Sequence, residues 1–106
     1  MRTPGGRAAK VSDVPSRQPP AAYFRAAERL GRRVHERRRE LGLTQEDLAD
    51  KTGISRNQIQ NIENNRNNAK HPETGKPGPG NARLDTVFLL ADALEVTVGY
   101  LIDPEA

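Results

Sequence analysis

The 106-residue chain contains no cysteine and no tryptophan, and only 4% of its residues are aromatic. Without cysteine it can form neither disulfides nor thiolate metal sites, which fits a reducing compartment, and we expect a cytoplasmic protein. The sequence has no apolar run long enough to cross a bilayer and no signal peptide. With 34% hydrophobic residues, we expect one small domain with a modest core.

The residue combinations that enzymes and metal sites require are also missing. No nucleophile has an adjacent base, no carboxylates pair in an apolar setting, and Gly75, Gly78 and Gly80 lie between prolines rather than after a strand. The two histidines, His35 and His71, have no partners at metal-ligand spacing, so we interpret both as ordinary surface residues. The sequence therefore predicts no enzymatic activity, no metal and no cofactor.

Positive charge is concentrated in the first part of the chain. Residues 1–41 contain eleven Arg or Lys against four acids, whereas residues 84–106 contain five acids and no base. Clustered basic residues are the electrostatic signature of nucleic-acid binding. We therefore expect a polyanion to approach the N-terminal half, with the acidic end facing away.

Residues 44–63 are the most informative stretch of the chain. Thr44 can cap a helix, and Asp47 three positions later completes a pattern close to a capping box. Gly53 can end this helix in a left-handed turn, and Ser55 can cap a second helix. The pattern predicts a helix over about 45–52, a tight turn, and a helix over about 56–64.

The second of these helices has an unusually uniform polar surface. Ile59 and Ile62 form its apolar stripe, and the rest of its circumference is amide or guanidinium: Arg56, Asn57, Gln58, Gln60 and Asn61. Arginine matches the acceptors of guanine, and Asn or Gln matches adenine, in a groove that admits a helix. Taken singly these residues would be an ordinary solvated face, but together, after a capped helix and a glycine turn, they favour contacts with DNA bases.

The pattern resembles the Cro and phage-repressor class of helix-turn-helix proteins, also called the xenobiotic-response-element family. Within the motif the matching residues are Thr44, Gln45, Leu48, Ala49, Gly53, Ile54, Ser55, Ile59, Ile62 and Glu63. Outside it they are Leu41, Gly42, Leu43, Leu84, Val87, Leu90, Ala91, Ala93, Leu94 and Val96. The resemblance covers about residues 30–103 and implies an all-α, compact five-helix bundle.

The resemblance also implies roles for individual residues. Base contacts would come from the polar face of the recognition helix, and phosphate contacts from Gln45, Ser55, Asn64 and Arg66, with Lys70 in the following loop as a further candidate. An ion pair between Arg38 and Glu63 would tie the first helix to the recognition helix. Where relatives usually have glycine this chain has Asn65, which also tolerates a left-handed conformation.

The segments around the motif leave alternatives open. Residues 1–20 are rich in Pro, Gly and Arg and predict a flexible arm, either inert or reaching the DNA. We expect residues 21–106 to form the DNA-binding domain. Its first helix runs from Pro20 to about Leu41 or, since Gly31 weakens it, starts near Leu30. Its buried side is marked by Phe24, Leu30, Val34 and Leu41.

After the recognition helix, an inserted loop of about 67–81 is either a tolerated surface insertion or a contact with the DNA backbone. In the fourth helix we expect a buried face of Leu84, Val87, Phe88, Ala91 and Leu94, widened by Leu90. The final helix carries Val98, Tyr100, Leu101 and Ile102, and this apolar surface would serve either core packing or a homodimer contact.

We therefore expect a sequence-specific regulator that binds a double-stranded DNA operator, associates with the nucleoid when bound, and represses transcription by occupancy. The alternative is an antitoxin that binds a partner toxin and regulates its own operon. Neither interpretation involves a membrane.

Overall fold

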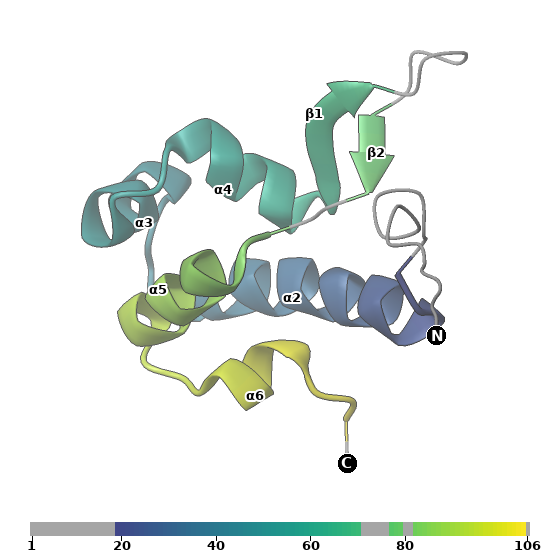
Figure 1. The fold of residues 1–106 in the computed structure, drawn as a ribbon. Coiled ribbons are helices and arrows are strands. Elements are labelled where there is room, and N and C mark those ends of the chain that lie inside the picture. The colour runs from purple at the N-terminus through teal and green to yellow at the C-terminus, as the bar shows by residue number, and fades with distance from the viewer. Residues whose placement is uncertain (1–18, 71–76, 80–81, 106) are drawn as a thin grey trace, which may run out of the picture.

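The computed structural model describes residues 19–70, 77–79 and 82–105, so most of the N-terminal arm and part of the inserted segment lie outside the described residues. The described residues form a bundle of five helices (Figure 1). They are α2 (Ala21–Glu40), α3 (Gln45–Thr52), α4 (Arg56–Glu63), α5 (Leu84–Leu94) and α6 (Val98–Ile102). This confirms the expected all-α fold. Within the described ranges, every helix is too short or too polar to span a membrane.

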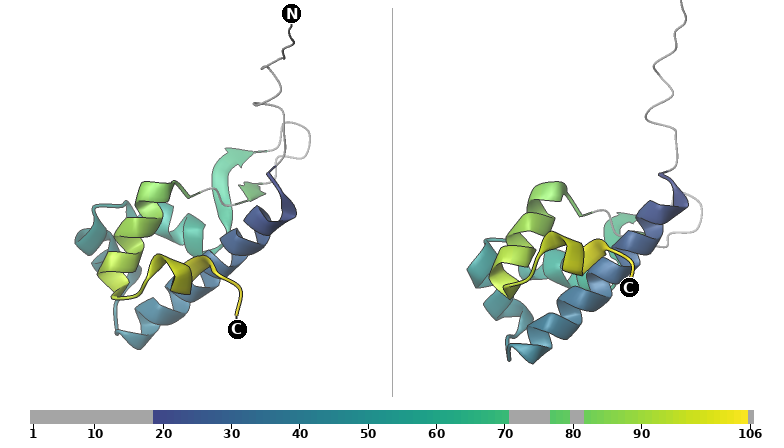
Figure 2. Two further views of the ribbon diagram at one scale, coloured as in Figure 1. Left: turned by 60° about the horizontal axis from the view of Figure 1, so that its bottom comes forward. Right: turned by 90° about the horizontal axis from the view of Figure 1, so that it is seen from below.

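The first helix, α2, is a single rod of 20 residues against which α4, α5 and α6 pack (Figures 1 and 2). It continues through Gly31 without interruption, so the alternative start near Leu30 is wrong. Leu30 and Val34 are buried, whereas Phe24 and Leu41 are only partly buried. Tertiary contacts on both sides of Gly31 therefore outweigh its low helix propensity.

Local signals in the sequence define the next two helices. Thr44 accepts a hydrogen bond from the backbone N–H of Asp47 at 2.9 Å, and the Asp47 carboxylate accepts one from the N–H of Thr44 at 2.9 Å. This is a complete capping box. At the other end of α3, Gly53 adopts φ 78°, a left-handed conformation that costs glycine little. Ser55 then caps α4 by accepting from the N–H of Gln58.

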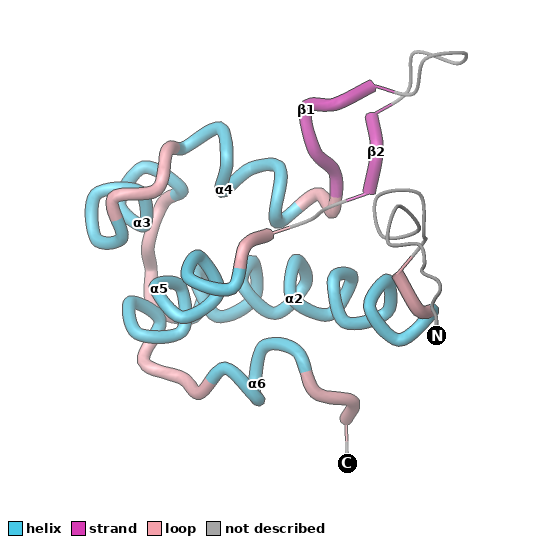
Figure 3. The backbone as a smooth tube through the Cα atoms, viewed as in Figure 1, coloured by secondary structure: helices cyan, strands magenta, loops and turns pink. Residues whose placement is uncertain are grey.

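After α4 the chain forms two short antiparallel strands, β1 (Arg66–Lys70) and β2 (Pro77–Pro79), which lie beyond the end of the recognition helix (Figure 3). We had expected only a loop here. Asn65 at φ 53° reverses the chain between α4 and β1, as its left-handed tolerance predicts. A strand that contains proline is possible because a two-stranded ribbon consists of edge strands only.

One hydrophobic core joins the five helices. Its fully buried members come from each of them: Val34, Leu48, Ile59, Leu90, Leu94 and Leu101. Leu101 shows that at least part of the apolar surface of α6 packs inward. The core fixes α4 between α2 and α3, with its polar side facing outward.

The apolar face expected for α5 is partly wrong. Val87, Leu90, Ala91 and Leu94 are buried together with Thr86, but Leu84 and Phe88 are 71% and 57% exposed. The apolar residues of this helix cover more of its circumference than one stripe, and α2, α3 and α6 cover only part of them.

Three arginines of α2, spaced by four residues, bind the C-terminal ends of the last two helices. Arg29 Nε donates to the Ile102 carbonyl at 2.9 Å, Arg33 Nη1 to the carbonyls of Tyr100 and Asp103, and Arg37 Nε to that of Leu94. The last carbonyls of a helix have no partner within it, so these donors satisfy them. These three arginines therefore serve the fold, although the concentration of positive charge in residues 1–41 had suggested a contact with a polyanion.

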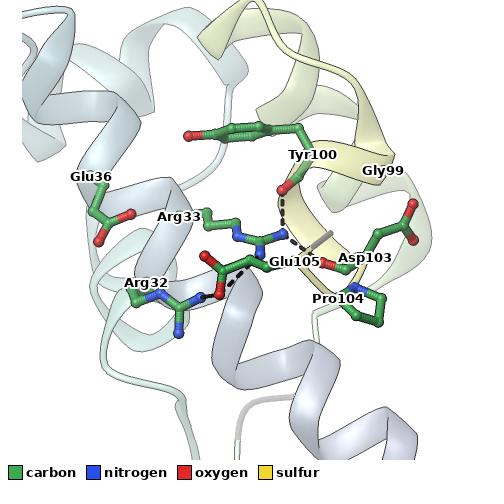
Figure 4. A pocket seen from close by; sticks show the side chains of 8 residues that line it. All are labelled: Arg32, Arg33, Glu36, Gly99, Tyr100, Asp103, Pro104 and Glu105. Atoms are coloured by element: carbon green, nitrogen blue, oxygen red, sulfur yellow. Dashed lines mark hydrogen bonds and ion pairs between the residues drawn. The ribbon is translucent and has the colours of Figure 1, made fainter.

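Arg33 lies in a small pocket between α2 and α6 (Figure 4). Its guanidinium carbon is 5.9 Å from the centre of the Tyr100 ring, and Glu105 lies near both Arg33 and Arg32. The pocket thus contains the contacts that attach the C-terminal segment to α2.

Candidate nucleic-acid interface

The recognition helix presents one continuous polar arc to solvent. Arg56, Gln60 and Asn64 are spaced by four residues and follow one line along α4, and Asn57 lies beside that line. Arg56, Asn57 and Asn64 are exposed and Gln60 is partly exposed. The arc carries guanidinium and amide groups, which can donate and accept hydrogen bonds at base edges.

The other two residues expected to contact bases lie elsewhere on α4. Asn61 is buried at 8% exposure, and its Oδ1 accepts a hydrogen bond from Arg66 Nε at 3.2 Å. The expectation that Asn61 lies on the outward face is therefore wrong. Gln58 is exposed but lies about 100° further round the helix than Asn57, on the far side from Arg56.

The residues expected at phosphates surround the two ends of α4. Ser55 lies at its N-terminus, and Asn64 and Arg66 follow its C-terminus, all exposed. Gln45 is the first residue of α3 and is partly buried. Its side chain points toward the end of α4, where Nε2 donates to Glu63 Oε1 at 3.2 Å. Lys70 ends β1, where the structure describes the backbone alone.

A buried polar cluster fixes the last turn of α4 to α2. Arg38 Nε donates to Glu63 Oε2 at 2.7 Å and Arg38 Nη2 to Glu63 Oε1 at 3.0 Å, which is a two-point ion pair. Arg38 Nη1 also donates to the Leu43 carbonyl, and so holds the segment that leads into α3. The Glu63 side chain is only 4% exposed, so this charge pair lies almost out of water.

Sequence reasoning missed the role of His35. Its Nδ1 lies 2.9 Å from Glu63 Oε1. Because a carboxylate only accepts, Nδ1 carries the proton in this contact. His35 is therefore part of the cluster rather than an ordinary surface residue. Its spacing of three residues from Arg38, on the same side of α2, was the available signal.

Burial raises the pKa of Glu63, but hydrogen bonds from Arg38, His35 and Gln45 outweigh it, so the pKa lies below its usual value. The pKa of Asp47 is also lowered, because its carboxylate accepts from the backbone and side chain of Thr44. Both carboxylates are therefore ionised at neutral pH. The side chains of the cluster bind one another and the Leu43 carbonyl, which assigns the cluster a structural role.

The comparisons with known proteins agree with this geometry. Residues 34–70 match a helix-turn-helix family, the Cro and phage-repressor type, and this segment contains α3, the turn and α4. The resemblance stated from the sequence is confirmed. Residues 34–70 therefore carry a helix-turn-helix of this type, a motif that is typical of DNA-binding transcriptional regulators.

Among solved structures, the chain is similar to the restriction-modification controller protein C.AhdI from Aeromonas hydrophila. The two share 28% sequence identity, with a TM-score of 0.54, over 72% of this chain and 96% of that one. No curated protein sequence matches this chain.

Proposed function

We propose that this protein binds a specific DNA operator by placing α4 in the major groove, and that occupancy represses transcription from the promoter it covers. The observation that carries the proposal is the exposed arc of Arg56, Asn57, Gln60 and Asn64 on a helix whose other side is fixed in the core. A rigidly held donor and acceptor surface is what direct reading of bases requires.

In this proposal the arc and its flanks have different tasks. Arg56, Asn57 and Gln60 meet base edges. Ser55 and Asn64 hold phosphates at the two ends of α4, together with Arg66, whose guanidinium is oriented by Asn61. Gln45 can reach a phosphate only if its amide turns away from Glu63. On DNA binding, its hydrogen bond to Glu63 would then be replaced by one to the phosphate.

A comparison of two arginines tests this division. The operator is first selected from random duplexes at two salt concentrations. We then expect Arg56→Ala to reduce discrimination between operator and scrambled DNA by about 1–3 kcal/mol, whereas Arg66→Ala weakens both alike and lowers the salt slope by about 1.

Arg32→Ala is the matched control, because Arg32 lies near Glu105 on the side of α2 that faces α6. It should change neither quantity. Equal losses on operator and scrambled DNA for Arg56→Ala would contradict its assignment to a base edge.

We also propose that two copies pair through α5. Leu84, Phe88 and Leu89 are 71%, 57% and 45% exposed and line one apolar hollow with Asp85 and Asp92. A contiguous apolar patch of this kind on a small protein is typical of a protein contact. A twofold pair would present two recognition helices to half-sites about one helical turn apart.

The likeness to a restriction-modification controller suggests which genes are regulated. We propose that the operator lies upstream of this gene or of a neighbouring restriction-modification operon. A reporter driven by that upstream DNA should lose expression when the protein is supplied, and should keep it when Arg56→Ala is supplied instead. Expression unchanged by the wild type, together with copurification of a small partner encoded beside the gene, would favour the antitoxin hypothesis.

A further inference from the structure

Gly31 allows α2 and the recognition helix to approach more closely than any other residue would permit. A Cβ built on Gly31 would lie 2.4 Å from the carbonyl oxygen of Ile62 and 3.2 Å from that of Glu63. Both atoms belong to the backbone of the last turn of α4, so no change of rotamer could relieve the contact. A side chain at this position must therefore push the end of α4 away from α2.

Gly31 belongs to one face of α2 that holds the end of α4. His35 and Arg38 follow it by four and seven residues, and both bind the Glu63 carboxylate. We call Gly31, His35 and Arg38 the seat of the recognition helix. The glycine sets the distance between the backbones, and the two donors fix the last residue of the helix at that distance.

The other end of α4 is held independently of the seat. Ser55 caps it, Gly53 sets the turn before it, and Ile54 is buried in the core. With one end fixed, a displacement at the seat becomes a rotation of the helix. Since α4 has 8 residues and is about 12 Å long, a shift of about 1 Å at its end tilts it by about 5°.

We propose that the seat sets the angle at which the recognition helix meets the bases, and that Gly31 is a positioning residue for sequence recognition although it contacts no DNA. The inference rests on the proposed function, because it assigns specificity to the orientation of Arg56, Asn57 and Gln60. Contacts at base edges depend on placement within about 0.5 Å, whereas contacts with phosphates tolerate movement.

The decisive comparison is Gly31→Ala with Gly99→Ala. Gly99 lies in α6, where an added Cβ would be too close only to the Asp103 carboxylate, a side chain that can move, and would be at an ordinary contact distance of 3.8 Å from the Thr97 hydroxyl. Both variants are measured below their melting temperatures, with circular dichroism confirming that they are folded. We expect Gly31→Ala to lose at least about tenfold in affinity for the operator. Its affinity for scrambled DNA at low salt should change less than about twofold. Gly99→Ala should change neither.

A second pair of variants covers the case in which Gly31→Ala does not fold. His35 is partly exposed, so His35→Ala removes one donor of the seat without opening a buried cavity. It should lower the ratio of operator to scrambled affinity by about threefold or more, which is the low end of what one hydrogen bond contributes. His35→Gln, whose amide can donate to Glu63, should restore it. The proposal would be overturned if folded Gly31→Ala had the wild-type ratio of operator to scrambled affinity. If Gly31→Ala does not fold, the same result for His35→Ala would overturn it.

Amide NMR spectra of the free proteins separate this proposal from the proposed function. In Gly31→Ala the amide resonances should shift along α4 from Ile59 to Asn64, whereas in Gly99→Ala they should not. Shifts confined to α2 would overturn the seat even if operator binding is specific. Shifts along α4 in a protein whose wild type prefers no duplex would support the seat and contradict the proposed function alone.

Discussion

At the scale of single residues, the Glu63 side chain connects the recognition helix to two other helices. Its carboxylate accepts from Arg38, His35 and Gln45, which belong to α2 and α3, and it closes α4 itself. It therefore joins three helices at one buried point. A buried charge costs little only while all of its partners remain.

Removing Glu63 should destabilise the protein more than removing an exposed acid. Glu63→Ala leaves Arg38 without its buried partner, and we expect a loss of about 3 kcal/mol or more in the free energy of unfolding. Glu46→Ala, an exposed change in the first turn of α3, should cost less than about 1 kcal/mol. Thermal and urea denaturation of the two variants measure the difference, and equal melting temperatures would show that the ion pair does not stabilise the fold.

Stability should also fall in acid in a way that depends on Glu63. Because its pKa is lower in the folded chain than its ordinary value of 4.5, the unfolded chain takes up the proton first. The stability that the ionised Glu63 contributes is fully present above pH 4.5 and is lost as the pH falls through the pKa of Glu63 in the folded chain. Urea titrations from pH 6 to pH 3 should therefore show a smaller difference between wild type and Glu63→Gln as the pH falls. A constant difference would show that the charge of Glu63 is not involved; Glu46→Gln is the control.

At the scale of elements, the described residues with a left-handed conformation are of the types that favour it, with one exception. Gly53 and Asn65, which precede and follow α4, are residues that tolerate the left-handed conformation they adopt. Glu95, which ends α5, adopts φ 61° although it is neither glycine nor asparagine. The chain must turn there so that Val96 can join the core.

Glu95→Gly should stabilise the protein. Relief of the left-handed strain is worth about 1–2 kcal/mol, and the added freedom of the unfolded chain takes back part of it, so we expect a net gain of about 0.5–1 kcal/mol. Asp92→Gly, at an exposed position inside the same helix, should instead destabilise by about 0.5–1 kcal/mol. Urea denaturation of both variants measures the effect. A loss of stability in Glu95→Gly would mean that the glutamate side chain contributes more than the strain costs.

At the scale of the whole molecule, the exposed polar and apolar surfaces belong to different helices. The polar arc belongs to α4, whereas the exposed apolar patch of Leu84, Phe88 and Leu89 belongs to α5. The arginines of α2 that bind α5 and α6 precede both helices in the sequence and hold the bundle together. Part of the positive charge in residues 1–41 is therefore engaged within the fold.

The proposed pairing through α5 predicts that Phe88→Asp keeps the fold but loses self-association. An exposed apolar residue contributes little to the stability of the single chain, so its melting temperature at low concentration should change little. Sedimentation should then show a monomer at concentrations where the wild type is a dimer. Tyr100→Ser tests α6, whose apolar surface the sequence had offered as a homodimer contact. If the dimer dissociates in Tyr100→Ser but not in Phe88→Asp, the interface lies on α6 rather than on α5.

The sequence by itself determined the helix-turn-helix, because each of its signals acts within a few residues. The cap at Thr44, the glycine turn at Gly53 and the cap at Ser55 need no distant partner, and they place Arg56 and Asn57 outward on α4. Other features depend on how the helices pack. Periodicity alone does not tell which of two apolar stripes meets a neighbour, so Phe88 was expected inside and lies outside.

The roles of His35, Gly31 and Asn61 likewise were decided only by the tertiary structure. Each depends on a residue brought close by packing or chain reversal: Glu63 for His35, the backbone of Ile62 for Gly31, and Arg66 for Asn61. Local hydrogen bonding selects conformation within one turn of helix, whereas contacts between elements depend on how the whole core excludes water. The first can be inferred from neighbouring residues, and the second requires the packed molecule.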